Sequence, residues 1–404
     1  MKHRLAPALI ALLTVPALGQ TRVSQLPAQS PTPPTARPDR TLLVDASGLG
    51  DFDDLPAAVA AAQSGALLQV APGSYSGATV TGKSLRIEAT FAGTARLTSL
   101  LEIVGIPAQH EVTLGGLFFE EGFLVDGCVG EVSLASCTAI NDGVVVPPPP
   151  GVHFSQYPDC GIGLSRHVIQ GSAAVSLVDC SLAGRDGEFY PFCDGSPGEH
   201  GLIVDDSRVA VYGGTYVGGH GSDAVGCHGA FAGAGGDGIL ARFAGSRVHH
   251  CNVSGAGGTG GIDMESGFHN GCPGLLFRDF GTEGFFECAP DHVTLEIESL
   301  VMPGALPTYT ITGPPGANIF LMAAPRRNWR EFAASEGILH LGAGLMSVPL
   351  GQMPASGTLS RPFPAPRPAW RLAYASIELQ VYARVAGQDR YSEPRTLQTV
   401  HPGQ

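Results

Sequence analysis

The chain has 404 residues, among them 56 glycines and 32 prolines, and only 15% of its residues are charged. Its 23 basic and 36 acidic residues give a formal net charge of −13. This charge argues against nucleic acid or an anionic membrane surface as a general partner, because phosphate binding needs a clustered positive surface. The glycine and proline content also argues against long solvated helices.

The first 40 residues are typical of an exported protein. Lys2 and Arg4 precede an apolar stretch over residues 5–17, and small residues follow at 17–19. That stretch is too short to span a bilayer, so we predict a signal peptide over residues 1–19. Residues 20–40 are rich in proline and predict an extended linker. We therefore expect a secreted or cell-surface protein without a membrane span.

Residues 41–75 predict a strand, a turn, a short helix and a second strand. Strands are expected over 41–44 and 66–70, and Asp54 before Leu55-Pro56 marks the start of an alanine-rich helix. The order strand, Asp-x-Ser-Gly turn, helix, strand, Pro-Gly-Ser-Tyr is similar to the N-terminal part of pectate-lyase-like and pectin-methylesterase-like proteins. That resemblance implies a right-handed parallel β-helix whose N-terminal end is covered by the helix.

An internal repeat supports the same fold class. The pattern is aliphatic, x, aliphatic, x, x, small or apolar, x, apolar, with a shortened last copy; its copies start at Val112, Val132, Val175, Val209 and Val248. The alternating pairs are strand-like, and the three-residue step is a turn into a second strand. We predict that the β-helix extends over residues 41–290.

Long Gly-rich or Pro-rich excursions interrupt the later coils at one phase of the repeat. We expect them to emerge along one flank of the coil and to wall a groove. Short strands that begin with glycine follow the excursions, at 161–164, 201–204, 238–241 and 261–264. Alternation places their second and fourth residues inward. The outward column beside them is then Ser165, Asp205, Arg242 and Glu265.

This column is the candidate catalytic site. Asp205 and Glu265 are expected about 10 Å apart with Arg242 between them, on a strand spacing of about 4.8 Å. Two carboxylates near that separation suit an inverting glycoside hydrolase. Alternatively, the acids hold Ca²⁺ and Arg242 acts in β-elimination, as arginine does in the pectate lyases that the fold resembles. A third possibility is a row of ion pairs without catalytic function.

Further residues are candidates for binding substrate or metal. Asp206 and His220 lie in Asp-Asp and Gly-His-Gly segments similar to those of polygalacturonases, although the Asn-Thr-Asp and Arg-Ile-Lys segments of that family are absent. Asp263 is outward, one column from Glu265. We also consider a metal site, although no spacing demands one; its candidates are Asp223, His228, Asp237, Asp263 and His269. No cofactor is certain, and calcium is the one considered.

The nine cysteines of an exported chain predict some disulfides and at least one free thiol. Cys137, Cys180 and Cys251 fall at matching phases of the repeat, so we expect them to stack inward. Pairs that the spacing allows are Cys193 with Cys227 and Cys272 with Cys288.

Residues 291–404 predict a small antiparallel β-sandwich, because spaced strands alternate with Pro/Gly turns. Two functions follow for the whole chain. It binds or processes polysaccharide along the outward face of one sheet, or it is a non-catalytic structural or adhesive surface protein with a C-terminal attachment module. We expect a monomer.

Overall fold

The computed structural model describes residues 41–139, 165–188, 194–225, 231–262, 264, 270–288 and, with short gaps, 292–400. Its single helix in that part of the chain is α1 (Leu55–Ala61), which lies between the first two strands. The Asp54 side chain accepts a hydrogen bond from the Leu55 amide at 2.9 Å and caps the helix, as predicted. No helix in the described ranges is long and apolar enough to cross a membrane.

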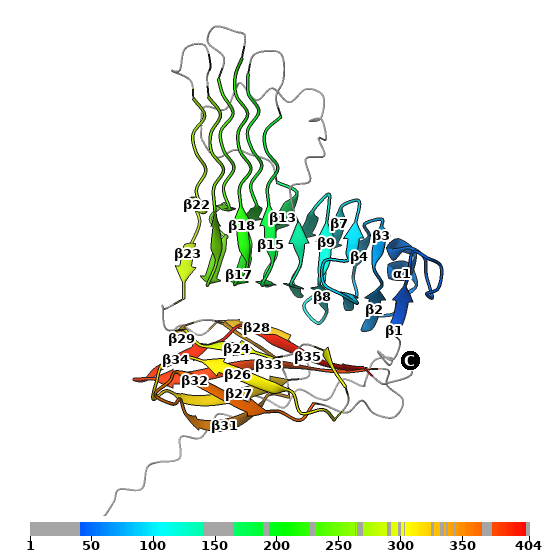
Figure 1. Cartoon of the computed structure of the whole chain (residues 1–404), viewed down its shortest axis with the longest axis vertical. Coiled ribbons are helices and arrows are strands. Elements are labelled where there is room, and N and C mark those ends of the chain that lie inside the picture. The colour runs from blue at the N-terminus through cyan, green and yellow to red at the C-terminus, as the bar shows by residue number, and fades with distance from the viewer. Residues whose placement is uncertain are drawn as a thin grey trace, which may run out of the picture. The chain divides into compact units, whose positions relative to one another are not determined.

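Three parallel sheets make up the region up to residue 287 (Figure 1). Sheet A contains β1 (Thr41–Val44), β2 (Ala66–Val70), β5 (Leu85–Ala89), β8 (Glu111–Gly115), β11 (Glu131–Ala135), β14 (Val175–Val178), β17 (Arg208–Tyr212), β20 (Arg247–Cys251) and β23 (Gly284–Glu287). Sheet B contains β3 (Gly73–Tyr75), β6 (Ala95–Leu97), β9 (Leu117–Phe119), β12 (Thr138–Ala139), β15 (Ser181–Ala183), β18 (Thr215–Val217) and β21 (Ser254–Ala256). Sheet C contains β4 (Thr79–Thr81), β7 (Leu101–Val104), β10 (Phe123–Asp126), β13 (His167–Gln170), β16 (Leu202–Asp205), β19 (Ile239–Arg242) and β22 (Phe277–Phe280).

From β2 onward the chain visits sheets A, B and C in the same order again and again. Buried aliphatic residues of all three sheets form one shared core. The predicted repeat is confirmed in register: the valines that start its copies are paired as neighbours in sheet A. The second halves of the full copies form neighbouring strands of sheet B.

Single residues in the left-handed conformation form two of the corners between sheets. The residue after a sheet A strand has positive φ at Gly116, Ser136, Asp179, Gly213 and Asn252. The residue after a sheet C strand has positive φ at Gly105, Gly127, Gly171, Asp206, Phe243 and Gly281. One such residue turns the chain sharply, which explains why glycine, asparagine and aspartate recur at these corners. A phenylalanine there is the exception.

The core contains a buried tyrosine hydroxyl without a partner. Tyr216 is fully buried, and its hydroxyl has no hydrogen bond within the described residues. Tyr75 is also buried, but its hydroxyl donates to the Ala71 carbonyl at 2.8 Å and accepts from the Ala46 amide. Burial raises the pKa of Tyr216 well above its usual value, so this hydroxyl stays neutral.

These two tyrosines give a matched stability prediction. Tyr216→Phe removes an unsatisfied polar atom, so the free energy of unfolding should stay constant or rise by up to about 1 kcal/mol. Tyr75→Phe removes satisfied hydrogen bonds and should lower it by about 1–2 kcal/mol. Denaturant unfolding of both variants provides the test, and an equal loss in both would refute the assignment.

Six Gly-rich segments run out from sheet B and return to sheet C in consecutive coils. The outgoing segments are 184–188, 218–225 and 257–262, and the returning segments are 194–201, 231–238 and 270–276. We call these six segments the Gly-rich bundle; Figure 1 shows them as extended traces that continue from the sheets. The predicted excursions at 184–198 and 218–236 leave at the same corner, as does the one after β21, which confirms for these two that they emerge along one flank. The predicted excursion at 141–160 lies outside the described residues.

Backbone hydrogen bonds within the bundle recur every third residue. The amides of Gly195, Gly198 and Gly201 donate to the carbonyls of Phe231, Ala234 and Asp237, which makes these returning segments parallel. Outgoing and returning segments are antiparallel, since Gly233 and Gly236 donate to Ser222 and Gly219. A period of three is that of the polyproline II helix, which has no internal hydrogen bonds and must form them with neighbours.

Glycine at every third position is a steric requirement of this bundle. A Cβ atom at Gly236 would lie 1.9 Å from the Glu199 carbonyl oxygen, and one at Gly219 would lie 1.8 Å from that of Arg185. Similar overlaps with backbone carbonyl oxygens occur at Gly233, Gly258 and Gly271. The segments therefore approach closely only because they lack side chains at these positions, as in collagen. The described parts of the excursions are therefore packed against one another.

Sheets of mainly antiparallel strands make up most of the C-terminal region. One contains β24 (Thr294–Glu296), β26 (Thr308–Thr312) and β32 (Thr358–Pro362). The larger one contains β25 (Leu300–Val301), β27 (Asn318–Ala324), β31 (Met346–Gln352), β33 (Tyr374–Val385) and β35 (Arg395–Val400), with β29 (Ser335–Glu336) and β34 (Gln388–Tyr391) at its side. A two-stranded sheet pairs β28 (Arg327–Glu331) with β30 (Ile338–Leu341). Residues of the first two sheets share one core.

Candidate functional site

Asp205 and Arg242 end neighbouring strands of sheet C. They are in register on β16 and β19, as predicted. The Arg242 guanidinium donates to both carboxylate oxygens of Asp205, from Nε at 2.8 Å and from Nη2 at 2.5 Å. The side chain of Asp205 is 12% exposed and that of Arg242 is 29% exposed. This bidentate ion pair gives both carboxylate oxygens a charged hydrogen-bond donor from within the protein.

The predicted third member, Glu265, does not follow in the column. The strand next to β19 is β22, and the residue paired with Arg242 is Phe280. On the other side, Asp205 is paired with Gln170. The prediction of a strand at 261–264 is wrong: Ile262 and Met264, which it placed inward, are 57% and 63% exposed. Glu265 and Asp263 themselves lie outside the described residues.

The inward predictions for the strands at 201–204 and 238–241 are confirmed, and the predicted strand at 161–164 lies outside the described residues. Leu202, Val204, Ile239 and Ala241 are fully buried in the shared core. The outward side of the same strands is also covered, since Ile203 is 3% exposed and Leu240 is 0% exposed. Within the described residues, the outward positions directly before the ion pair on both strands are therefore covered.

The side chains of Asp206 and His220 are not part of the ion pair, although the Asp206 amide donates to the Arg242 carbonyl at 3.4 Å. Asp206 is an exposed corner residue with a φ of 45°, a conformation that aspartate tolerates better than most residues. His220 is on the outgoing segment 218–225, where its amide donates to Asp186 at 2.7 Å. Its Nδ1 accepts the Thr259 amide at 2.9 Å, so the neutral ring carries its proton on Nε2. Both residues have local structural roles.

A buried charged cluster at the base of the Gly-rich bundle was not predicted. Asp237 is fully buried, and its carboxylate accepts from Arg278 Nε at 2.9 Å and from the Leu275 amide at 2.7 Å. His200 Nδ1 accepts the Asp237 amide at 2.8 Å and lies 3.2 Å from Asp237 Oδ2. Burial alone would raise the pKa of Asp237, but the nearby His200 ring and the hydrogen bonds that Leu275 and Arg278 donate outweigh it and lower the pKa.

The sequence did contain a signal for this cluster. His200 and Asp237 each stand two residues before the first inward residue of a sheet C strand, Leu202 and Ile239. Equivalent positions in neighbouring coils are stacked, so the pattern predicts that the side chains of His200 and Asp237 lie next to each other. We had assigned Asp237 to a metal site instead.

The predicted metal site is not assembled from the residues that the structure describes. Asp237 is engaged in its own cluster, and the Asp223 carboxylate accepts the Ile262 amide at 2.8 Å. His228, Asp263 and His269 lie outside the described residues. Within the described part, no group of three or more His, Cys, Asp or Glu residues has a geometry that could hold a metal ion. Calcium binding stays a prediction.

The cysteines differ from the expectation in two ways. Cys251 pairs with Cys288, with a Cα–Cα distance of 5.1 Å, and Cys272 is disulfide-bonded as well, so the Cys272–Cys288 pair is wrong. Cys137 and Cys180 are buried free thiols in the core, as predicted. Cys251 instead belongs to a separate cluster with Val178 and Tyr212, because it is in register with Tyr212. Cys193 and Cys227 lie outside the described residues.

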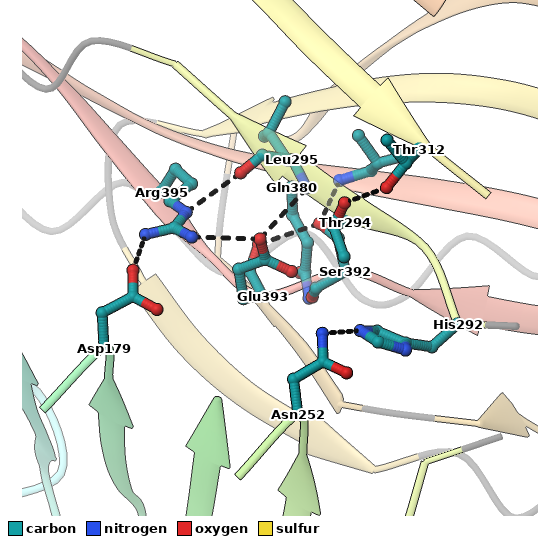
Figure 2. Close-up of polar contacts among 11 residues, drawn as sticks. Asp179, Asn252, His292, Thr294, Leu295, Thr312, Gln380, Ser392, Glu393 and Arg395 are labelled. Carbon is teal, nitrogen blue, oxygen red and sulfur yellow. Dashed lines mark hydrogen bonds and ion pairs between the residues drawn. The ribbon is translucent and has the colours of Figure 1, made fainter. Parts of the chain in front are cut away.

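Two corner residues of the parallel sheets contact the C-terminal region, which belongs to the same compact unit, residues 38–404. Figure 2 shows Arg395 between Asp179 and Glu393: Nη1 lies 2.6 Å from Asp179 Oδ2, and Nη2 lies 3.2 Å from Glu393 Oε1. Asn252 Nδ2 lies 2.9 Å from His292 Nε2. Asp179 and Asn252 both occupy left-handed corners where other coils have glycine. The side chains of Asp179 and Asn252 therefore contact the C-terminal region from these two corners.

Comparison of the chain with protein-family models, with curated proteins and with solved structures finds no match. Its own geometry is therefore what supports a function.

Proposed function

We propose that the chain is an exported, non-catalytic structural or adhesive surface protein, built on a right-handed parallel β-helix. The repeated passage through sheets A, B and C supports a β-helix. Parallel strands joined by crossovers are right-handed in about 98% of cases, which supports the handedness. The shared core of the antiparallel sheets supports a β-sandwich in residues 291–404, which serves for attachment. The predicted signal peptide supports export.

The observation that carries the non-catalytic function is the closed pair of Asp205 and Arg242. An acid–base catalyst needs a carboxyl group with a free oxygen near a space for substrate. Both Asp205 oxygens instead accept hydrogen bonds from one guanidinium, beside covered aliphatic residues. This arrangement stabilises the sheet and offers no site for a reacting atom.

The proposal predicts that this pair contributes to stability. Asp205→Asn and Arg242→Met should each lower the free energy of unfolding, and the double variant should lose less than the sum. The coupling energy should be about 1–3 kcal/mol, because the pair is bidentate and largely shielded from water. A double-mutant cycle by denaturant unfolding measures it. A coupling energy near zero would mean that the pair does not stabilise the fold. A catalytic or binding role for Asp205 and Arg242 would then have to be considered again.

A second candidate function, polysaccharide binding, is favoured by Phe243. This phenylalanine has a φ of 69° and is 60% exposed, at a corner where four earlier coils (Gly82, Gly105, Gly127 and Gly171) and the following coil have glycine. Strain at a bulky residue that gains no burial points to a function for the ring. Phe280, on the adjacent strand, is 44% exposed. Flat aromatic rings at a surface provide stacking faces for sugar rings.

The strain gives a prediction with opposite signs for stability and binding. Phe243→Gly should raise the free energy of unfolding by about 1 kcal/mol, because glycine adopts positive φ without strain. It should also weaken binding to any polysaccharide that the wild type retains. Co-sedimentation with a panel of insoluble polysaccharides measures binding, and Phe91→Gly, which removes a ring that is 63% exposed in an early coil, is the control. Unchanged binding by the Phe243→Gly variant would contradict a role for the Phe243 ring in polysaccharide binding.

A further inference from the structure

The two ends of the parallel sheets differ in how they are closed. At the first end, α1 buries Leu55, Ala58 and Val59. Lys83 Nζ donates to the carbonyls of Val59 and Ala62, which belong to the end of that helix. At the other end, β21, β22 and β23 are the last strands of sheets B, C and A, with a hydrogen-bonded neighbour strand on one side within the described residues. Figure 1 shows β22 and β23 at that end.

We call the last coil, with β21, β22, β23 and the segments 257–262 and 270–276, the terminal face. Large apolar side chains are exposed on β22, on β23 and on both Gly-rich segments of this face, and also at Met264, which lies beside the first of these segments. They are Ile262 at 57%, Met264 at 63%, Leu275 at 52%, Phe280 at 44% and Phe286 at 37%. An exposed edge of extended chains together with apolar side chains is a strong template for association. Repeat proteins need a capped end to stay soluble, and among the described residues no helix lies over the last coil as α1 lies over the first.

We infer that the terminal face binds the terminal face of a second copy of this chain. A partner must match three strand edges and two Gly-rich segments at once, in fixed relative positions. The first end of another copy does not match, because α1 covers it and because β1 extends sheet A beyond the other two sheets. The same face of another copy matches by symmetry, as in most homodimers.

The topology defines which twofold axis is suitable. The Gly-rich bundle leaves from sheet B and returns to sheet C, so it stands at the corner between them. A twofold axis through that corner and the middle of sheet A places β23 against its copy and β21 against β22 of the copy. All these pairs are antiparallel, and each outgoing segment meets a returning one, as already occurs within the bundle. A dimer with this axis therefore gives hydrogen-bond partners to the backbone groups at the edges of all three sheets and of the Gly-rich bundle.

Side chains at the terminal face suit such close contact. β21 is Ser254-Gly255-Ala256, and Gly255 carries no side chain that would keep a partner strand away. Of the charged residues on β22, Arg278 is already held by the buried Asp237 carboxylate. Phe277 and Phe285 pack against each other at 5.0 Å and fill the end of the core, so a copy would meet these apolar side chains next to the exposed Asp279 and Glu287.

Sedimentation velocity of the full exported chain over a range of concentrations tests the inference. We expect a dimer that the variant Phe280→Glu converts to a monomer and that the control Phe91→Glu leaves intact, since Phe91 is exposed in an early coil. Ile262→Lys, on the Gly-rich segment, should act as Phe280→Glu does and covers the case in which that variant fails to fold. We also expect amide exchange of β22 and β23 to slow as the dimer forms.

Three results would overturn the inference. A chain that stays monomeric at all concentrations has no such interface. A dimer that withstands both Phe280→Glu and Ile262→Lys uses another surface. Open-ended polymers would mean that the terminal face binds a different surface of the next copy, because a twofold contact closes on itself. None of these results bears on whether the chain is catalytic, so this inference and the proposed function fail separately.

Discussion

We expect Gly236→Ala to lower the free energy of unfolding by about 3 kcal/mol, the upper part of the range for inserting atoms into a packed interior. The added methyl group would lie 1.9 Å from the Glu199 carbonyl oxygen and 2.4 Å from its carbon. Both are backbone atoms of a returning segment, which cannot move aside without breaking its own bonds to two neighbours. Denaturant unfolding followed by circular dichroism measures the loss.

Gly115→Ala is the matched control for this prediction. Gly115 also lies in an extended segment of negative φ, but its Cβ would meet the flexible side chain of Glu88 at 3.2 Å. Its free energy of unfolding should change by less than about 1 kcal/mol. Equal, small effects of both substitutions would mean that the Gly-rich segments are not packed against one another in solution.

The second large effect concerns the dependence of stability on pH. His167 is inward on β13 and fully shielded from water, and burial lowers its pKa from 6.5 to about 4. Between these two values the unfolded chain binds a proton that the folded chain does not. The free energy of unfolding should therefore fall as the pH falls from 6.5 to 4, by about 3 kcal/mol from this residue. Above pH 6.5 the contribution is constant.

His167→Phe isolates that contribution. The variant retains an aromatic ring beside Phe123, whose ring centroid lies 5.2 Å from that of His167. As the pH falls from 6.5 to 4, the free energy of unfolding of the variant should rise relative to that of wild type, because only wild type loses the contribution of His167. Above pH 6.5 the difference between the two should stay constant. Denaturant unfolding at five or six pH values measures both curves. Parallel curves across this window would show that His167 is not buried in its neutral form.

The sequence predicted the strands well where side chains alternate between water and core. The copies that start at Val132, Val175 and Val209 are in register because a slip by one residue would turn their aliphatic side chains outward. The same reasoning placed Asp205 beside Arg242. The pattern indicates which residues are neighbours, but it does not indicate whether a neighbouring acid and base form a closed pair or flank a substrate.

Prediction failed in the Gly-rich segments for a physical reason. Their packing depends on backbone carbonyls and missing side chains, so no hydrophobic period reveals it. The strand predicted at 261–264 had the glycine and alternating apolar residues of a sheet C strand, yet residues 261 and 262 belong to the bundle. Glycine at 195, 198 and 201 did carry a signal, a period of three, which we interpreted as loop composition.

The cysteine error has a similar origin. The copy that starts at Val248 turns after Cys251, at Asn252, which has a φ of 54°. Cys251 is thus the last residue of its strand and faces outward, two positions before the site that Cys180 occupies in its own coil. Aligning turns as well as valines would have placed it correctly.

The measurement that tests the central claim most directly is the length of polysaccharide chains after incubation with the protein. A panel of neutral and acidic polysaccharides, with calcium supplied, is analysed by size-exclusion chromatography and for new reducing or unsaturated ends. A non-catalytic surface protein predicts unchanged chain lengths and no new ends, including for any polysaccharide that binds. Shortened chains that disappear with Asp205→Asn or Arg242→Met would contradict the proposal and return catalysis to this pair.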